Sequence, residues 1–139
     1  MINGCCIKRW SSTQAIISLS SGEAEFYGIV KAASVGLGVQ ATLRDLGVDL
    51  SLEIFTDAAV AKGIASRKGL GKTRHIAVHL LWVQERVAKG DFNLTKVWGG
   101  DNPADLLTKR LTREVINNHM KKCGLKYLEG RADEAPKLP

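Results

Sequence analysis

Three separated acidic motifs constrain the fold of this chain more than any other feature. The first runs from Ser20 to Tyr27, the second from Ile54 to Asp57, and the third from Asp101 to Lys109. The pattern of apolar residues places them at the start of a helix, at the end of a short strand, and at the start of another helix. Such junctions are where α/β folds bind ligands. Because clustered carboxylates repel one another unless a cation lies between them, the sequence favours a site for hard divalent metals.

The composition predicts one globular domain with a positive charge. The chain has 139 residues, of which 45% are apolar, and this is enough for a sizeable core. Twenty Lys and Arg against fourteen Asp and Glu give a net charge of +6, which favours a polyanionic partner. No apolar run approaches the roughly 20 residues that cross a bilayer, so we expect a soluble intracellular protein without a membrane partner. The cysteines Cys5, Cys6 and Cys123 are odd in number, which disfavours a disulfide framework or a zinc site.

Predicted strands alternate with predicted helices, which indicates an α/β fold. Strands are expected near Gly4 to Trp10, at 52–56 and at 92–98, and the last two are expected to be parallel. Helices are expected at 21–46, 58–66, 75–89 and 114–123, and from residue 102 or 103 onward. The segment 67–74 combines four cations with two glycines, which predicts a mobile basic loop. Residues 126–139 have the composition of a disordered tail.

The first predicted helix carries start, packing and end signals. Ser20 followed by Glu23 is typical of a capping box. Apolar residues recur at helical spacing and predict the buried face, namely Phe26, Val30, Ala33, Leu37 and Ala41. Gly36 lowers helix propensity and therefore indicates close packing or a bend at that position. Gly47 is the expected C-terminal cap.

Five ordered motifs resemble a known family. They are Trp10 to Gln14, Leu19 to Phe26, Thr56-Asp57, Thr73 to Ile76, and Ala104 to Lys109. Together they resemble the ribonuclease H domain of copia-type retrotransposon Pol polyproteins, and the similarity covers residues 4–125. The resemblance implies a ribonuclease H-like fold, in which a mixed sheet is flanked by helices.

The resemblance also implies an activity and a site. The family hydrolyses the RNA strand of RNA/DNA hybrids as an endonuclease, with two Mg²⁺ ions that Mn²⁺ can replace. Its catalytic and metal-binding carboxylates correspond here to Glu25, Asp57 and Asp105. Basic residues next to the site are expected to contact the nucleic acid, namely Arg67, Lys68, Lys72, Arg74 and His75. The reverse transcriptase portion of the same polyprotein is the expected protein partner.

The chain departs from the family pattern at its beginning. In this fold the first strand is central and carries the first catalytic aspartate, yet residues 1–22 contain no Asp or Glu. We therefore expect the first strand to be absent and the second to be absent or reduced to a remnant. The isolated chain is then expected to be inactive, as a fragment of a longer polyprotein, as part of a degenerate element, or as a sequence whose start is misplaced. Sheet edges exposed in this way predict self-association. A second departure is Ala77, where the family has an acid.

Simpler interpretations exist for the same acids. Glu23 and Glu25 stabilise a helix by lying in its first turn, where acids are favourable against the helix dipole. Asp57 precedes a predicted helix and can serve as its N-cap. On these interpretations the acids are structural, and for Glu23 the structural interpretation is the one we favour.

Two further sets of residues have structural alternatives. The cations of segment 67–74 can form an ordinary solvated loop, and His75 can be a surface or packing residue. Trp10, Trp82 and Trp98 are interpreted as packing residues rather than as platforms for stacked bases. For the whole chain, the alternative to a ribonuclease H is a non-catalytic remnant or scaffold that binds nucleic acid. A polynucleotidyl transferase relative of the same fold is disfavoured by the motif from Ala104 to Lys109.

Overall fold

The computed structural model describes residues 1–14, 17–73, 75–127 and 130. Contacts divide the chain into two compact units, one formed by residues 12–102 and the other by residues 1–11 together with residues 103–139. Each unit is described by itself. The elements are those of a mixed α/β protein, as predicted.

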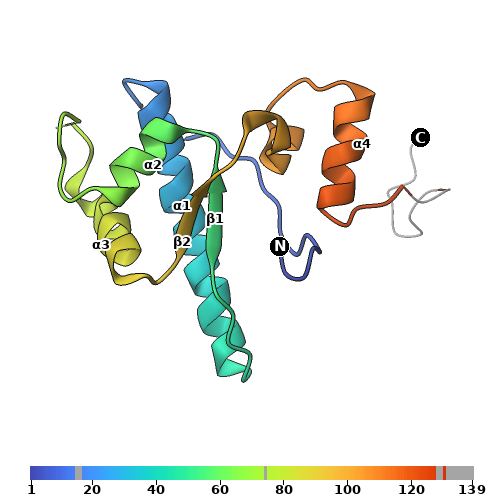
Figure 1. Cartoon of the computed structure of the whole chain (residues 1–139), viewed down its shortest axis with the longest axis horizontal. Coiled ribbons are helices and arrows are strands. Elements are labelled where there is room, and N and C mark those ends of the chain that lie inside the picture. The colour runs from blue at the N-terminus through green and yellow to red at the C-terminus, as the bar shows by residue number, and fades with distance from the viewer. Residues whose placement is uncertain (15–16, 74, 128–129, 131–139) are drawn as a thin grey trace, which may run out of the picture. The chain divides into compact units, whose positions relative to one another are not determined.

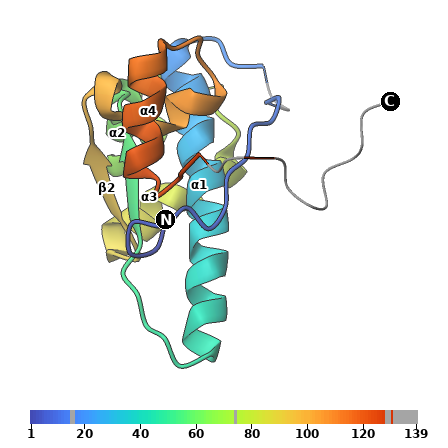
Figure 2. The same cartoon turned by 90° about the vertical axis from the view of Figure 1, so that its right-hand side faces the viewer.

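The unit of residues 12–102 is built on a two-stranded parallel sheet. Strand β1 (Glu53–Thr56) pairs with strand β2 (Asn93–Lys96), with Glu53 opposite Asn93 and Thr56 opposite Lys96. Helix α1 (Ser21–Asp45) runs alongside the strands, and helices α2 (Ala59–Ser66) and α3 (Trp82–Lys89) complete the unit (Figures 1 and 2). Parallel strands need a crossover connection, and here α2 and α3 lie within it.

The core of this unit lies between α1, the sheet and the two short helices. Phe26, Ala33 and Val83 are fully buried, and Ile54 of β1 and Ile64 of α2 pack with them. Burial of each large apolar side chain contributes about 1.5–3 kcal/mol. The predicted stripe of α1 is confirmed as far as Leu37, which is partly buried against this cluster, whereas Ala41 is exposed.

The local signals of α1 act as predicted, with one variation. The Ser20 hydroxyl accepts a hydrogen bond from the Glu23 backbone N–H at 3.2 Å, as an N-cap does. The Glu23 side chain does not complete a capping box, because it accepts the N–H of Leu19 instead. At the other end Gly47 adopts a left-handed conformation with φ +82°, and its N–H donates to the carbonyl of Arg44.

Two predicted elements are wrong. No strand forms among residues 4–10, and the segment contributes only an isolated bridge between Ile2 and Cys5. A strand is stable only against a partner, and the described sheet contains β1 and β2 alone. The helix predicted at 75–89 begins later, with a short 3₁₀ turn (Val78–Leu80) followed by α3. His75 lies outside helix α3, because its ring is hydrogen-bonded to Glu23 of α1.

The other unit contains a 3₁₀ helix, η3 (Pro103–Leu107), and helix α4 (Arg113–Lys122). Its N-terminal segment is tied to the end of α4, because the Cys6 N–H donates to the Cys123 carbonyl at 3.1 Å. Gly124 has φ +67°, and a Cβ there would lie 2.9 Å from the Gly4 carbonyl oxygen, so only glycine fits. Most of the predicted tail at 126–139 lies outside the described residues.

None of the helices in the described ranges has both the length and the apolar composition of a membrane-spanning segment.

Candidate functional site

Asp57 lies directly after β1, at the carboxyl end of the parallel sheet. Its side chain is half-buried. Helix α2 begins with Ala58 as its N-cap and has no side-chain capping bond, so the interpretation of Asp57 as an N-cap is wrong. The Ala58 N–H is satisfied by the Thr56 hydroxyl at 3.2 Å. Within the described ranges, no hydrogen bond or ion pair is made by the Asp57 carboxylate, which leaves its oxygens available to a ligand.

Two glycines let the neighbouring segments approach this edge of the sheet. A Cβ at Gly99, just after β2, would lie 3.4 Å from Oδ2 of Asp57. A Cβ at Gly22 would lie 2.5 Å from Cγ1 of Val60, so the first turn of α1 touches the first turn of α2. Glu25, an exposed residue near the start of α1, therefore belongs to a segment adjacent to the one that carries Asp57.

Glu23 is buried in the first turn of α1 and is held by three donors. Its side chain is 1% exposed. Oε1 accepts the hydroxyl of Tyr27 at 2.8 Å, and Oε2 accepts the backbone N–H of Leu19 at 2.8 Å. Oε2 also contacts Nε2 of His75 at 2.7 Å, across 52 positions of sequence.

These contacts shift two pKa values. Burial alone would raise the pKa of Glu23, but the hydrogen bonds from Leu19, Tyr27 and His75 outweigh it and lower that pKa below 4.5. Burial, followed by the hydrogen bond to Glu23, raises the pKa of Tyr27 to about 12. Glu23 is therefore an ionised buried carboxylate at neutral pH. Since all three donors converge on its two oxygens, Glu23 is poorly suited to bind a metal.

The basic loop, residues 67–73, follows α2 and is anchored by buried groups. The Arg67 guanidinium donates to the Leu70 carbonyl and to the Thr73 hydroxyl, both within the loop. Gln84 of α3 accepts the Gly69 N–H at 2.9 Å and donates to the Gly69 carbonyl at 3.0 Å. Arg67 thus organises the loop.

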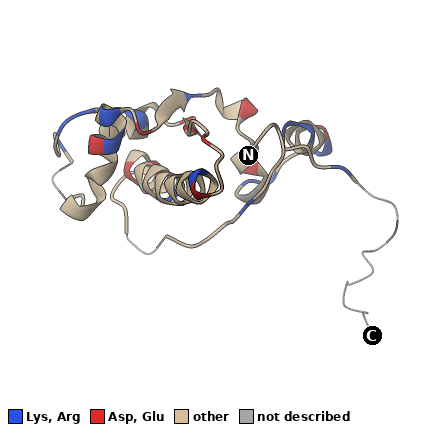
Figure 3. Cartoon of the chain, turned by 90° about the horizontal axis from the view of Figure 1, so that it is seen from below, with Lys and Arg blue, Asp and Glu red and all other residues tan. Residues whose placement is uncertain are grey.

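The other cations of this region differ in exposure. Lys68 and Lys72 are exposed, and the loop appears as a blue stretch in Figure 3. Arg74 lies outside the described residues. His75 follows it, and its side chain is 42% exposed.

Asp105 belongs to the other unit, where it lies in η3. Its side chain is 12% exposed, and its Oδ2 accepts from Nζ of Lys109 at 3.0 Å. Glu25 and Asp57 therefore lie in the same unit, and Asp105 lies in the other.

The donor chemistry of Glu25 and Asp57 fits magnesium in part. Both are hard oxygen donors, and Mg²⁺ commonly uses one or two protein carboxylates together with waters and substrate phosphates. The Asp57 carboxylate has no competing partner in the described part of the chain. However, no three His, Cys, Asp or Glu side chains among the described residues are grouped so as to hold a metal ion. The described carboxylates therefore do not form a complete two-metal site.

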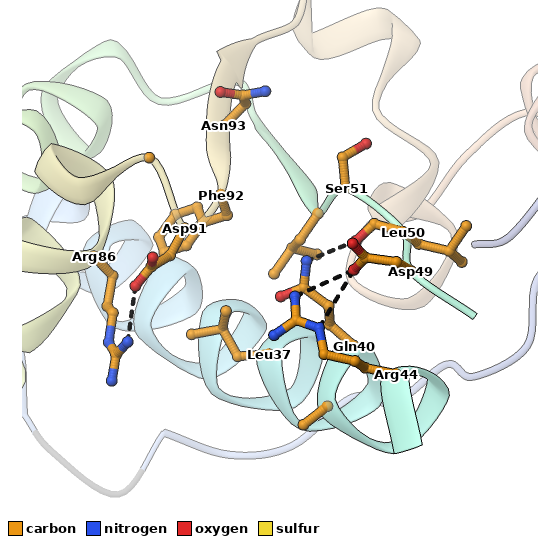
Figure 4. Close-up of a pocket in the computed structure, with 13 residues that line it drawn as sticks. Leu37, Gln40, Arg44, Asp49, Leu50, Ser51, Arg86, Asp91, Phe92 and Asn93 are labelled. Atoms are coloured by element: carbon orange, nitrogen blue, oxygen red, sulfur yellow. Dashed lines mark hydrogen bonds and ion pairs between the residues drawn. The ribbon is translucent and has the colours of Figure 1, made fainter. Parts of the chain in front are cut away.

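A groove of about 570 Å³ lies at the opposite, amino end of the strands. Leu37, Leu52 and Phe92 line it, and ion pairs join Arg44 to Asp49 and Arg86 to Asp91 (Figure 4). The N–O distances are 3.2 Å and 2.8 Å. Leu37 lies between the two pairs in this view. This groove is therefore distinct from the edge that carries Asp57.

Sequence reasoning missed two features of this unit. Glu23 looked like an ordinary first-turn acid, because its partner His75 is too distant in sequence for a local pattern to reveal. Trp98 was expected to be packed but is 77% exposed just after β2. Its position directly before Gly99-Gly100, at the end of a strand that precedes a turn, was the only available clue.

Comparison with known proteins identifies relatives of this chain. The chain resembles one region of transposon Pol polyproteins. It is 26% identical over 126 residues to the retrovirus-related Pol polyprotein from transposon TNT 1-94 of Nicotiana tabacum. It is 29% and 28% identical over 120 residues to those from transposons RE2 and RE1 of Arabidopsis thaliana.

Each of these matches covers 84% of the chain but only 8–10% of the relative, so the chain spans a small part of the length of these proteins. No protein-family model matches the chain, and no solved structure matches it.

Proposed function

We propose that this chain is the ribonuclease H segment of a retrotransposon Pol polyprotein. It binds RNA/DNA hybrids, and it hydrolyses the RNA strand when a further acid completes the metal site. The observation that carries the proposal is Asp57, a half-buried carboxylate at the carboxyl end of a parallel strand. Within the described ranges it caps no helix and pairs with no cation.

Other charged residues are assigned roles in this proposal. Glu25 and Asp57 would hold a magnesium ion, and Asp105 is proposed to join them in the complete domain. The chemistry that bound magnesium supplies is activation of a water and stabilisation of the departing 3′ oxygen. Lys68, Lys72, Arg74 and His75 are proposed to contact the phosphates of the hybrid. Such contacts set position and affinity without reading sequence.

The test compares hybrid cleavage by the chain with cleavage by a longer chain that includes the upstream polyprotein segment. We expect Mg²⁺- or Mn²⁺-dependent cleavage of a labelled RNA/DNA hybrid by the longer chain only. Asp57→Asn should lower this cleavage by more than about 100-fold, the upper figure for groups that merely support a metal ligand.

The matched control is Asp45→Asn. This exposed acid is the last residue of α1, at the far end of a 25-residue helix from Glu25. Its removal should leave cleavage unchanged. Cleavage that survives Asp57→Asn, or that is lost equally in both variants, would contradict the site assignment.

A second candidate function is binding without catalysis. It is favoured by the lack, within the described ranges, of any group of three metal-ligating side chains. Hybrid binding by both chains without cleavage by either would support a non-catalytic remnant or scaffold of a degenerate element.

The free edge of β1 is proposed as the surface for protein partners. In the described sheet β1 pairs only with β2, and Phe55 is 54% exposed beside buried Ile54. Open edges recruit further strands, so we expect a second copy or the reverse transcriptase portion to cover this one.

Size-exclusion chromatography with light scattering tests the surface. Lysine opposes edge pairing, so Phe55→Lys should convert a self-associated chain to monomers. Val78→Lys, which changes another exposed apolar residue, should leave the chain self-associated. A wild-type chain that is already monomeric would contradict self-association.

A further inference from the structure

The Glu23 carboxylate is buried and is held by donors from two separate parts of the chain. Removing a charge from water is expensive, and a buried ion pair is often no more stabilising than apolar residues of similar volume. The donors Leu19 and Tyr27 are within four positions of Glu23, whereas His75 is 52 positions away and comes after the basic loop in the sequence. The contact with His75 therefore holds this later segment against the start of α1.

The bond to Glu23 also determines which edge of the His75 ring is free. A carboxylate only accepts hydrogen bonds, so Nε2 carries the hydrogen and donates to Oε2. With Nε2 engaged and the side chain 42% exposed, Nδ1 is the remaining polar atom of the ring. In an imidazolium both nitrogens are donors, and a second N–H at Nδ1 then suits an anionic acceptor.

We propose that Glu23 is a positioning residue, which fixes the ring of His75 through Nε2 so that Nδ1 faces a phosphate of the bound nucleic acid. The inference rests on the proposed function, since it names how one contact of that site is held. The Glu23 carboxylate is the internal partner of the ring, and the phosphate is its external partner. Exposed Lys68 and Lys72, in the basic loop that precedes His75, provide a matching positive surface. A bond from a charged donor to phosphate is of the stronger class.

The test is a double-mutant cycle on RNA/DNA hybrid binding by the full chain, measured by fluorescence anisotropy. Glu23→Gln keeps an oxygen that accepts from Nε2 but removes the charge. His75→Gln keeps a donor for Glu23 at the position of Nε2 but has no counterpart of Nδ1. Each variant should weaken hybrid binding about tenfold, and the double variant should be no weaker than either one.

Tyr27→Phe is the matched control. It removes a different hydrogen bond from Glu23, at Oε1, and leaves the contact of His75 intact. It should lower the melting temperature while hybrid affinity changes less than about twofold. A purely structural role of Glu23 would instead make Tyr27→Phe and Glu23→Gln alike in both measurements.

Nitrogen-15 NMR of the imidazole gives a second readout that does not require binding. The Nε2 signal should show a hydrogen-bonded N–H in the wild type and should shift in Glu23→Gln.

The outcomes separate the two proposals. Additive losses in the cycle, in a chain that binds hybrid, would overturn only the role of Glu23. An Nε2 signal that is unchanged in Glu23→Gln would overturn it as well. A wild-type chain that binds no nucleic acid would overturn both the proposed function and this inference.

Discussion

The two ends of the β1–β2 sheet differ in how their charges are partnered. At the amino end, Arg44 and Arg86 each pair with a nearby exposed or half-buried aspartate around an open groove. At the carboxyl end, Asp57 has no partner in the described part of the chain, and Glu23 is enclosed by three donors. The charges of the groove are already neutralised by these ion pairs. The two ends therefore differ in how their charged groups are partnered, and this difference is the basis on which we propose the carboxyl end for chemistry.

The two ends of the sheet are also expected to differ in how much a substitution changes the free energy of unfolding. Exposed ion pairs such as Arg44 with Asp49 contribute about 0–1 kcal/mol each, so the amino end tolerates change. The carboxyl end combines a desolvated carboxylate with a tight helix contact at Gly22, and both are sensitive to substitution. The predictions below test this contrast.

The largest expected effect on stability is at Gly22. Gly22→Ala would place a Cβ 2.5 Å from Cγ1 and 2.9 Å from Cβ of Val60, which requires a shift of the α1–α2 contact. We expect a loss of about 1–3 kcal/mol in the free energy of unfolding, measured by chemical denaturation. Gly36→Ala, toward the amino end, meets only the flexible tip of Leu52 and should cost less.

Gly28→Ala serves as the control for helix propensity in this comparison. Gly28 is exposed on α1, and a Cβ there meets nothing within 4 Å. Gly28→Ala should therefore raise the free energy of unfolding by about 0.5–1 kcal/mol. A loss at Gly28 equal to that at Gly22 would show that the α1–α2 contact is not the cause.

The second prediction concerns acid pH. Since the folded-state pKa of Glu23 is lowered, its contribution to stability is present above about pH 4.5 and is lost as the pH falls through that lowered value. The glutamine side chain in the Glu23→Gln variant does not titrate in this range of pH. The difference in melting temperature between wild type and Glu23→Gln should therefore narrow below pH 4.5, as followed by circular dichroism. A difference that stays constant down to the lowest folded pH would contradict the buried pair.

The smallest effect is expected for single exposed cations. Lys72→Ala, in the basic loop, should weaken hybrid binding about threefold and lower the slope of log affinity against log salt by about one. Arg86→Ala, at the amino end, should leave that slope unchanged, because its guanidinium is already bound to Asp91. Equal salt-dependence slopes for the two variants would show that the two ends of the sheet do not differ in their contact with nucleic acid.

Elements with local signals could be predicted from the sequence. Helix α1 has a capping residue at Ser20 and a left-handed glycine at its end, and both signals lie within the segment itself. The parallel pairing of β1 with β2 followed from the helices between them. The strand expected at 4–10 was wrong because strand formation depends on a partner elsewhere in the chain.

The candidate site was predictable only in part, for the same reason. The position of Asp57 at a strand end followed from local pattern, and its lack of a capping role did not. Glu23 was interpreted as a first-turn acid because the contact that buries it joins α1 to His75. Long-range pairs of this kind leave no periodicity or spacing that a single sequence reveals.

The contact of Glu23 with His75 also has a kinetic consequence. It joins residues 52 positions apart, and closing a loop of this length costs entropy, so we expect it to form late in folding. Contacts that form after the transition state influence the unfolding rate rather than the folding rate. We therefore expect Glu23→Gln to increase the unfolding rate and to leave the refolding rate unchanged. The wild-type pair would then lengthen the lifetime of the native state.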